Sequence, residues 1–179
     1  KVAILTMGAH GIILYPTETI YGLGANVFDD AALSKLFALK GRDESQTASW
    51  LVRSIEDIER YAKMSGTAHK IAAALLPGPL TLVLPAKGIV PERRKAPDNT
   101  VGIRVSSDPM AQSIIEAFMA EYDAPLTCTS ANVSGQPSLP TVPEILQQFG
   151  EKASMIDEIH DDGPRKGLAS TVVKVVDDD

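Results

Sequence analysis

The sequence predicts an α/β fold: one domain in which a twisted mixed β-sheet is flanked by helices. Short apolar runs typical of buried strands alternate with segments whose apolar residues recur at helical spacing. A length of 179 residues, with 44% hydrophobic and 22% charged side chains, suits a single globular domain. Several connections are too short for a crossover between parallel strands, so we expect a mixed sheet of at least six strands.

The N-terminal third supplies a strand, a loop and a helix. The continuous apolar run at residues 11–15 predicts a buried strand that ends at a proline. The polar, glycine-bearing segment 16–24 predicts a loop. Asp29 or Asp30 then N-caps a helix whose leucines recur at helical spacing, and this helix ends near Gly41.

The middle of the chain combines a strand with two consecutive helices. Residues 49–52 predict the strand. Ser54, followed three residues later by Asp57, resembles a capping box and starts a helix over residues 55–63. An apolar helix over residues 67–76 follows and ends at a Pro-Gly-Pro turn.

The remaining elements again alternate between strands and helices. An Asp-Pro pair precedes the helix predicted over residues 110–121, and a proline lies in the first turn of the helix predicted over residues 143–149. The strands predicted in this part cover residues 80–84, 101–105, 125–129 and 171–176. Helices interleaved with strands in this order are expected to cover the faces of the sheet.

Charge, hydropathy and cysteine content exclude several classes of protein. The net charge of −6 and the pI near 5.1 argue against nucleic acid as the main ligand. Residues 157–179 carry seven acids and three bases, net −4, so the rest of the chain has a net charge of only −2 and can still hold a local anion site. No apolar run approaches the roughly 18 residues that cross a bilayer. The single cysteine fits a reducing compartment, so we expect a cytoplasmic protein without membrane association.

The common catalytic motifs are missing from the sequence. The histidines are isolated from one another and Cys128 stands alone, so no zinc site is expected. There is no GxSxG nucleophile motif and no GxxxxGK[ST] phosphate loop. Gly22-Leu23-Gly24 lacks the third glycine of a dinucleotide fingerprint.

Three features remain as candidates for binding chemistry, and each also has an ordinary structural explanation. Residues 130–135 are either an anion-binding turn at the end of a strand or a common Asn/Ser/Gly turn. Lys40 and Arg42 either stabilise the C-terminus of a helix or clamp a phosphate. Arg104, in an apolar strand, needs either a structural carboxylate or an anionic ligand as its partner.

Six segments, taken together, resemble one known family. They cover residues 11–24, 40–42, 77–81, 100–104, 130–135 and 170–173. In order and spacing they resemble the YrdC-like threonylcarbamoyl-adenylate synthases over nearly the whole chain. The resemblance implies that residues 1–179 form a single YrdC-like catalytic domain. Because Lys1 is not an initiator methionine and relatives continue beyond the last segment, we expect this domain to be cut short at both ends.

The resemblance also implies a reaction. L-Threonine, bicarbonate and ATP would yield L-threonylcarbamoyl-AMP and pyrophosphate, with Mg²⁺ bound mainly by the phosphates of ATP and by water. A separate transferase would then carry the threonylcarbamoyl group to adenosine 37 of tRNA, and weak RNA binding is a further expectation. Two alternatives are a double-stranded-RNA-binding module and the carbamoyl-adenylate-forming domain of a carbamoyltransferase. The acidic pI and the length of the chain count against them.

Site residues are carried over from the family at matching positions. The resemblance assigns ATP binding to Lys40, Arg42, Ser130, Asn132, Ser134 and Thr141. It assigns threonine binding to Thr17, Tyr21, Thr100, Arg104 and Ser170. Lys40 and Arg42 would also be the catalytic residues, and Arg104 would take the threonine carboxylate. No metal site made of protein side chains is implied.

The sequence departs from the family pattern just after Lys-Gly-Arg. Relatives usually have proline there, whereas this chain has Asp43 and Glu44. Two carboxylates beside a phosphate clamp would repel a triphosphate unless they face solvent or help to hold the metal ion. Glu18 also stands where aspartate is commoner.

Overall fold

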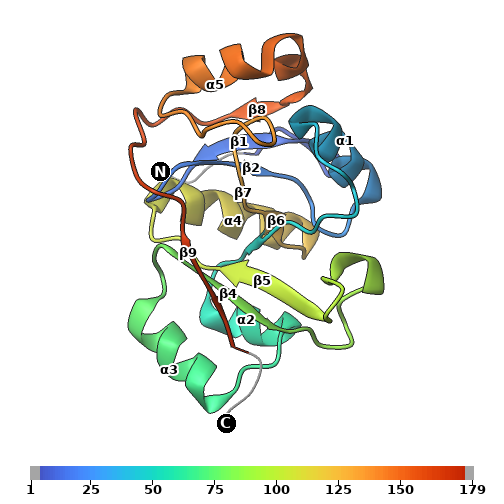
Figure 1. The fold of residues 1–179 in the computed structure, drawn as a ribbon, viewed down its shortest axis with the longest axis vertical. Coiled ribbons are helices and arrows are strands. Elements are labelled where there is room, and N and C mark those ends of the chain that lie inside the picture. Colours follow the sequence, from blue (N-terminus) through green and yellow to red (C-terminus); the bar gives the residue numbers. More distant parts are fainter. Residues whose placement is uncertain (1–4, 176–179) are drawn as a thin grey trace.

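The computed structural model describes residues 5–175 and has a mixed α/β fold built on two small sheets (Figure 1). The first sheet has the order β7-β2-β1-β8, with β7 Thr129–Ser130, β2 Tyr21–Gly24, β1 Ile13–Pro16 and β8 Glu158–Ile159. The second has the order β6-β3-β5-β4-β9, with β6 Leu126–Thr127, β3 Trp50–Leu51, β5 Thr100–Arg104, β4 Leu80–Pro85 and β9 Thr171–Lys174. Each sheet mixes parallel and antiparallel pairs, so the predicted fold class is confirmed, with its strands divided between two sheets.

The predicted helices are all present, with ends within about two residues of those expected. They are α1 Asp30–Lys40, α2 Ile55–Tyr61, α3 Gly66–Leu75, α4 Pro109–Tyr122 and α5 Val142–Phe149. Short 3₁₀ helices, η1 Glu92–Arg94 and η2 Gly150–Met155, were not predicted. Helix α1 begins where the Asp29 carboxylate accepts from the amide of Ala32 at 2.7 Å, and it ends at Gly41, whose φ of 62° is the left-handed conformation that glycine adopts easily. None of the helices within residues 5–175 is long and apolar enough to span a membrane.

The prediction of a loop over residues 16–24 is wrong in its second half, which forms β2. This strand pairs antiparallel with β1, so that Leu14 lies opposite Leu23. Its glycines serve close packing: a Cβ on Gly24 would lie 2.8 Å from Cγ2 of Ile13. The glycines that suggest a turn in the sequence are therefore part of a tightly packed sheet.

The strand predicted over residues 125–129 is interrupted. Leu126 and Thr127 pair with β3 in the second sheet, whereas Thr129 and Ser130 pair with β2 in the first. Cys128 lies between them, and its amide donates to the carbonyl of Ser49 at 2.6 Å. This short stretch therefore joins the two sheets. The end of the last predicted strand, Val176, lies outside the described residues, and β8 was not predicted.

Strand β1 is buried on both faces, which explains its unbroken apolar run. Ile12 and Leu14 belong to a core cluster with α1 and α5. Ile13 and Tyr15 belong to a larger cluster that includes the second sheet and α4. Figure 1 accordingly shows the first sheet with α1 and α5 at one end of the molecule and the second sheet with α2 and α3 at the other.

Candidate active site

A cavity of 230 Å³ is lined by residues of both sheets and contains several of the predicted site residues. Gly22, Thr129 and Ser130 come from the first sheet, whereas Arg104 comes from the second. The predicted site residues that line this cavity are Thr17, Tyr21, Arg42, Arg104, Ser130 and Ser170. They come from distant parts of the chain and meet where the two sheets are joined.

Arg104 is the most buried charged group in the cavity lining, at 4% exposure. Its Nη2 donates to Oε1 of Glu18 at 2.5 Å, and the other oxygen of Glu18 accepts from the hydroxyl of Ser106. Its Nε is buried and has no hydrogen-bond partner. Of the two partners that the sequence allowed, the structural carboxylate is present, and Glu18 accepts from only one nitrogen of the guanidinium.

The electrostatic surroundings of Arg104 favour its charged form. Burial lowers the pKa of the guanidinium, but Coulombic interactions with Cys128, Glu18 and Tyr15 act the other way and raise it overall. Burial, followed by interactions with Cys128, raises the pKa of the Tyr15 phenol well above its usual value. Tyr15 stays protonated and donates to the carbonyl of Thr127 at 3.0 Å. Arg104 is therefore held as a cation between Glu18, Tyr15 and Cys128.

Lys40 lies beside the cavity, at the C-terminal end of α1. Its ammonium donates to the backbone carbonyl of Ser130, and only 3% of the residue is exposed. Burial, with a smaller contribution from the charge of Arg42, lowers its pKa to about 8. Within residues 5–175 Lys40 forms no salt bridge, so a nearby anion would relieve the cost of burying its charge.

Arg42 reaches the cavity from the turn after α1. Its Nε donates to Oε1 of Gln46 at 2.8 Å and its Nη2 donates to the carbonyl of Thr47 at 2.8 Å. Burial lowers the pKa of this guanidinium. Asp43 and Glu44 are exposed and do not line the cavity, so they face solvent, which is one of the two arrangements that the sequence left open.

Thr17 and Tyr21 contribute to the cavity wall in a different way from the arginines. The Thr17 hydroxyl donates to the carbonyl of Ile20 at 2.6 Å and so closes a turn. The Tyr21 hydroxyl donates to the carbonyl of Gly163 at 2.7 Å and accepts from the amide of Asp162 at 3.0 Å. Both hydroxyls are engaged in the fold, and Tyr21 ties segment 161–163 to the first sheet.

Ser170 lies next to Thr81, a residue to which the sequence analysis assigned no role. Its hydroxyl lies 2.9 Å from that of Thr81, on the adjacent strand β4, and both residues line the cavity. Thr81 ends one of the six matched segments, which was a usable signal. Ser49 and Cys128 also line the cavity and lie outside those segments, so nothing in the sequence pointed to them.

The other predicted residues do not line this cavity. Thr100 lies at the far end of β5, where its hydroxyl donates to Asp98 at 2.6 Å. Thr141 caps α5. Asn132 is buried and its side-chain amide donates to the carbonyls of Val133 and Gln136, while its Oδ1 has no partner. The amide of Ser134 donates to the carbonyl of Lys40 at 2.8 Å, which places the 130–135 turn against the end of α1.

Comparison with known proteins agrees with this architecture. Residues 6–179 match the family model Sua5_yciO_yrdC, described as telomere recombination. A putative threonylcarbamoyl-AMP synthase of Methanocaldococcus jannaschii is 34% identical over 168 residues, which cover 93% of this chain and 75% of that protein. The threonylcarbamoyl-AMP synthase of Pyrococcus abyssi is 35% identical over 168 residues, which cover 93% of this chain but only 47% of that protein. The chain therefore spans about half the length of the Pyrococcus relative.

Comparison with solved structures indicates the same family. The crystal structure of P. abyssi Sua5 complexed with L-threonine superposes with a TM-score of 0.82 at 34% identity, covering 93% of this chain and 47% of that one. E. coli YciO superposes with a TM-score of 0.79 at 27% identity, covering 94% of this chain and 79% of that one. With a family model that matches nearly the whole chain and a relative matched over three quarters of its length, this protein belongs to the Sua5/YciO/YrdC family.

Proposed function

We propose that this chain synthesises L-threonylcarbamoyl-AMP from L-threonine, bicarbonate and ATP, with release of pyrophosphate. The observation that carries the proposal is the cavity in which Arg42 and Arg104 meet the hydroxyls of two sheets. Two cations and several hydroxyls suit ligands that carry hydroxyls and an anionic group, which is the carboxylate in threonine and the phosphates in a nucleotide. The activity is also the one named for the relatives described above.

Threonine would lie at the Arg104 end of the cavity. Arg104 lines the cavity, and its guanidinium would donate to the carboxylate of threonine. The hydroxyls of Ser170, just before β9, and of Thr81, in the neighbouring strand β4, lie at the same cavity and are suited to the polar groups of the amino acid. Thr17 and Tyr21 would shape the wall rather than donate from their hydroxyls, because those are already engaged.

The ATP phosphates would lie at the other end, between the end of α1 and the 130–135 turn. Lys40 and Arg42 would neutralise the charge that builds up as pyrophosphate leaves, which is an electrostatic form of catalysis. Ser130, Asn132 and Ser134 belong to the turn that packs against Lys40 and would contact the nucleotide. For Thr100 and Thr141, which lie away from the cavity, we propose structural roles.

Bicarbonate and Mg²⁺ complete the proposed reaction. The amine of threonine would attack the carbon of bicarbonate and expel water to give a carbamate. A carbamate oxygen would then attack the α-phosphorus of ATP as pyrophosphate departs. Within residues 5–175 no three acidic, histidine or cysteine side chains gather to hold a metal ion, so Mg²⁺ would be held mainly by phosphates and water. The product is a reactive anhydride that a separate tRNA threonylcarbamoyl transferase would consume.

Pyrophosphate release tests the proposal. The protein is incubated with Mg²⁺, ATP, L-threonine and bicarbonate, and each of the last two is omitted in turn. We expect pyrophosphate only when both are present. Release that is independent of either one would overturn the proposed function.

A further inference from the structure

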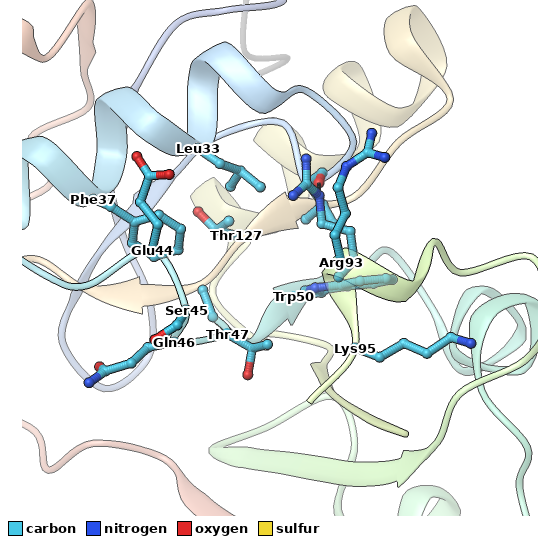
Figure 2. A pocket seen from close by; sticks show the side chains of 13 residues that line it. Leu33, Phe37, Glu44, Ser45, Gln46, Thr47, Trp50, Arg93, Lys95 and Thr127 are labelled. Carbon is cyan, nitrogen blue, oxygen red and sulfur yellow. Dashed lines mark hydrogen bonds between the residues drawn. The ribbon is translucent and has the colours of Figure 1, made fainter. Parts of the chain in front are cut away.

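A second and larger cavity of 370 Å³ lies next to the candidate active site, and segment 44–48 separates the two cavities (Figure 2). The two cavities have only Thr47 and Ala48 in common among their lining residues. None of the residues that would contact a substrate in the proposed reaction lines this second cavity, although Gln46, which accepts a hydrogen bond from Arg42, does. Its volume is in the range of small-molecule sites, about 300–1,000 Å³.

The floor of this second cavity is apolar and rigid. Leu33 and Phe37 come from α1, and Trp50 comes from β3; each is at most 7% exposed. The Trp50 indole packs edge-on against Phe28 and Tyr61, with ring centroids 5.7 and 5.6 Å apart. Fixed aromatic surfaces of this kind favour a flat apolar ring as their ligand.

One wall of the cavity carries excess positive charge. Arg93 and Arg94 both pair with the single carboxylate of Asp30, which leaves one charge uncompensated. The Arg94 side chain is 12% exposed and is fixed by a 2.6 Å hydrogen bond from Nε to the carbonyl of Val27. In Figure 2 the ammonium of Lys95 points away from the cavity, so the excess charge belongs to the two arginines.

The opposite wall is polar and comes from the segment that separates the two cavities. Ser45, Gln46 and Thr47 line it. Glu44 lies on this side too, across the cavity from Arg93 in Figure 2. An anion is therefore favoured only at the arginine wall, and the body of a ligand would lie over the aromatic floor between the walls.

We propose that this second cavity binds a small molecule with one flat apolar ring system and one anionic group. The ring would lie against Phe37 and Trp50, and the anion would take the free donors of Arg93 and Arg94. The proposal is independent of the proposed function, because the residues that carry it do not line the candidate active site.

The test uses the only tryptophan of the chain, Trp50, as its reporter. In ¹⁵N-labelled protein its indole N–H gives a single signal, which is followed while 2-naphthoate is added and, separately, its neutral isostere 2-naphthamide. We expect a saturable shift with naphthoate, an affinity about tenfold weaker for the amide, as a charge-assisted hydrogen bond implies, and no change when L-threonine is saturating.

Matched variants separate this site from general surface charge. Arg93→Gln should weaken naphthoate binding several-fold, whereas Arg60→Gln should leave it unchanged; Arg60 is likewise an exposed arginine paired with one aspartate, Asp123. The single indole signal also reports whether each variant is folded. The proposal is overturned by an absent or non-saturating shift, by equal affinity for acid and amide, by wild-type affinity in Arg93→Gln, or by displacement with threonine.

Discussion

The guanidinium of Arg104 is only partly engaged within the fold. Glu18 holds Nη2, which fixes the side chain, while the buried Nε has no partner. The ion pair with Glu18 offsets the cost of burying the charge of Arg104 in an apolar strand, and the guanidinium keeps donors that Glu18 does not use. This arrangement suits a residue that binds a carboxylate in one orientation.

Replacing Arg104 by lysine tests whether its guanidinium binds the threonine carboxylate. A lysine keeps the charge beside Glu18, so the fold should persist, but it loses the planar fork. We expect threonine to bind about 10 to 100 times more weakly and ATP affinity to change less than about threefold. Calorimetric titration of each ligand measures both. Equal losses for the two ligands would contradict the assignment of Arg104 to threonine.

The buried ammonium of Lys40 makes ATP binding depend on pH. Its pKa of about 8 in the free protein means that the charged form is lost as pH rises through that value. A bound phosphate favours the charged form, so ATP affinity should be nearly constant below pH 7 and fall above pH 8, by at most about tenfold per unit. Titrations between pH 6.5 and 9.5 measure this fall. Lys40→Arg should remove it, and a fall that persists in that variant would refute the role of Lys40.

At the scale of elements, the segment after α1 positions Arg42. Gln46→Ala removes the acceptor of Arg42 Nε and should raise the KM for ATP about three- to tenfold with little change in kcat, because the guanidinium is displaced and not removed. Gln46→Glu keeps the acceptor and should stay near wild type. Ser45→Ala, in the same segment, is the matched control. A change confined to kcat would argue against a positioning role.

Strand β2 was missed because its residue pattern predicts a turn and not a strand. Tyr-Gly-Leu-Gly reads as a turn because glycine is a turn residue, yet both glycines are buried next to β1. The need for glycine arises from Ile13 and Tyr15 on the partner strand, and a single sequence does not reveal that pairing. The helices were predictable because their caps and apolar spacing are local.

Adding one methyl group to β2 tests that explanation. The new Cβ in Gly24→Ala would lie 2.8 Å from Ile13 and 3.1 Å from the ring of Tyr15. We expect a loss of about 1–3 kcal/mol in the free energy of unfolding, measured with urea. Gly88→Ala is the control, since its Cβ would meet no atom within 4 Å. Equal stability of the two variants would contradict the packing argument.

For the whole molecule, the site depends on how two sheets are joined. The chain leaves the second sheet at Thr127 and enters the first at Thr129, so Cys128 and Ser130 arrive at the cavity together. The sequence itself indicated Arg42 and Arg104 as candidates and the family resemblance added Ser170, but their meeting is a property of tertiary structure. Ser49 and Thr81 were not assigned for the same reason: their side chains matter only because of what they face.

Isotope tracing shows directly whether threonine and the carbon of bicarbonate enter an adenylate. The protein is supplied with ATP, L-threonine and [¹³C]bicarbonate, and the adenylate product is examined by mass spectrometry. We predict an AMP adduct that contains threonine and one ¹³C atom, formed in step with pyrophosphate and strongly reduced in Arg104→Lys at low threonine. An adenylate without the ¹³C atom, or no threonine-containing adduct at all, would contradict it.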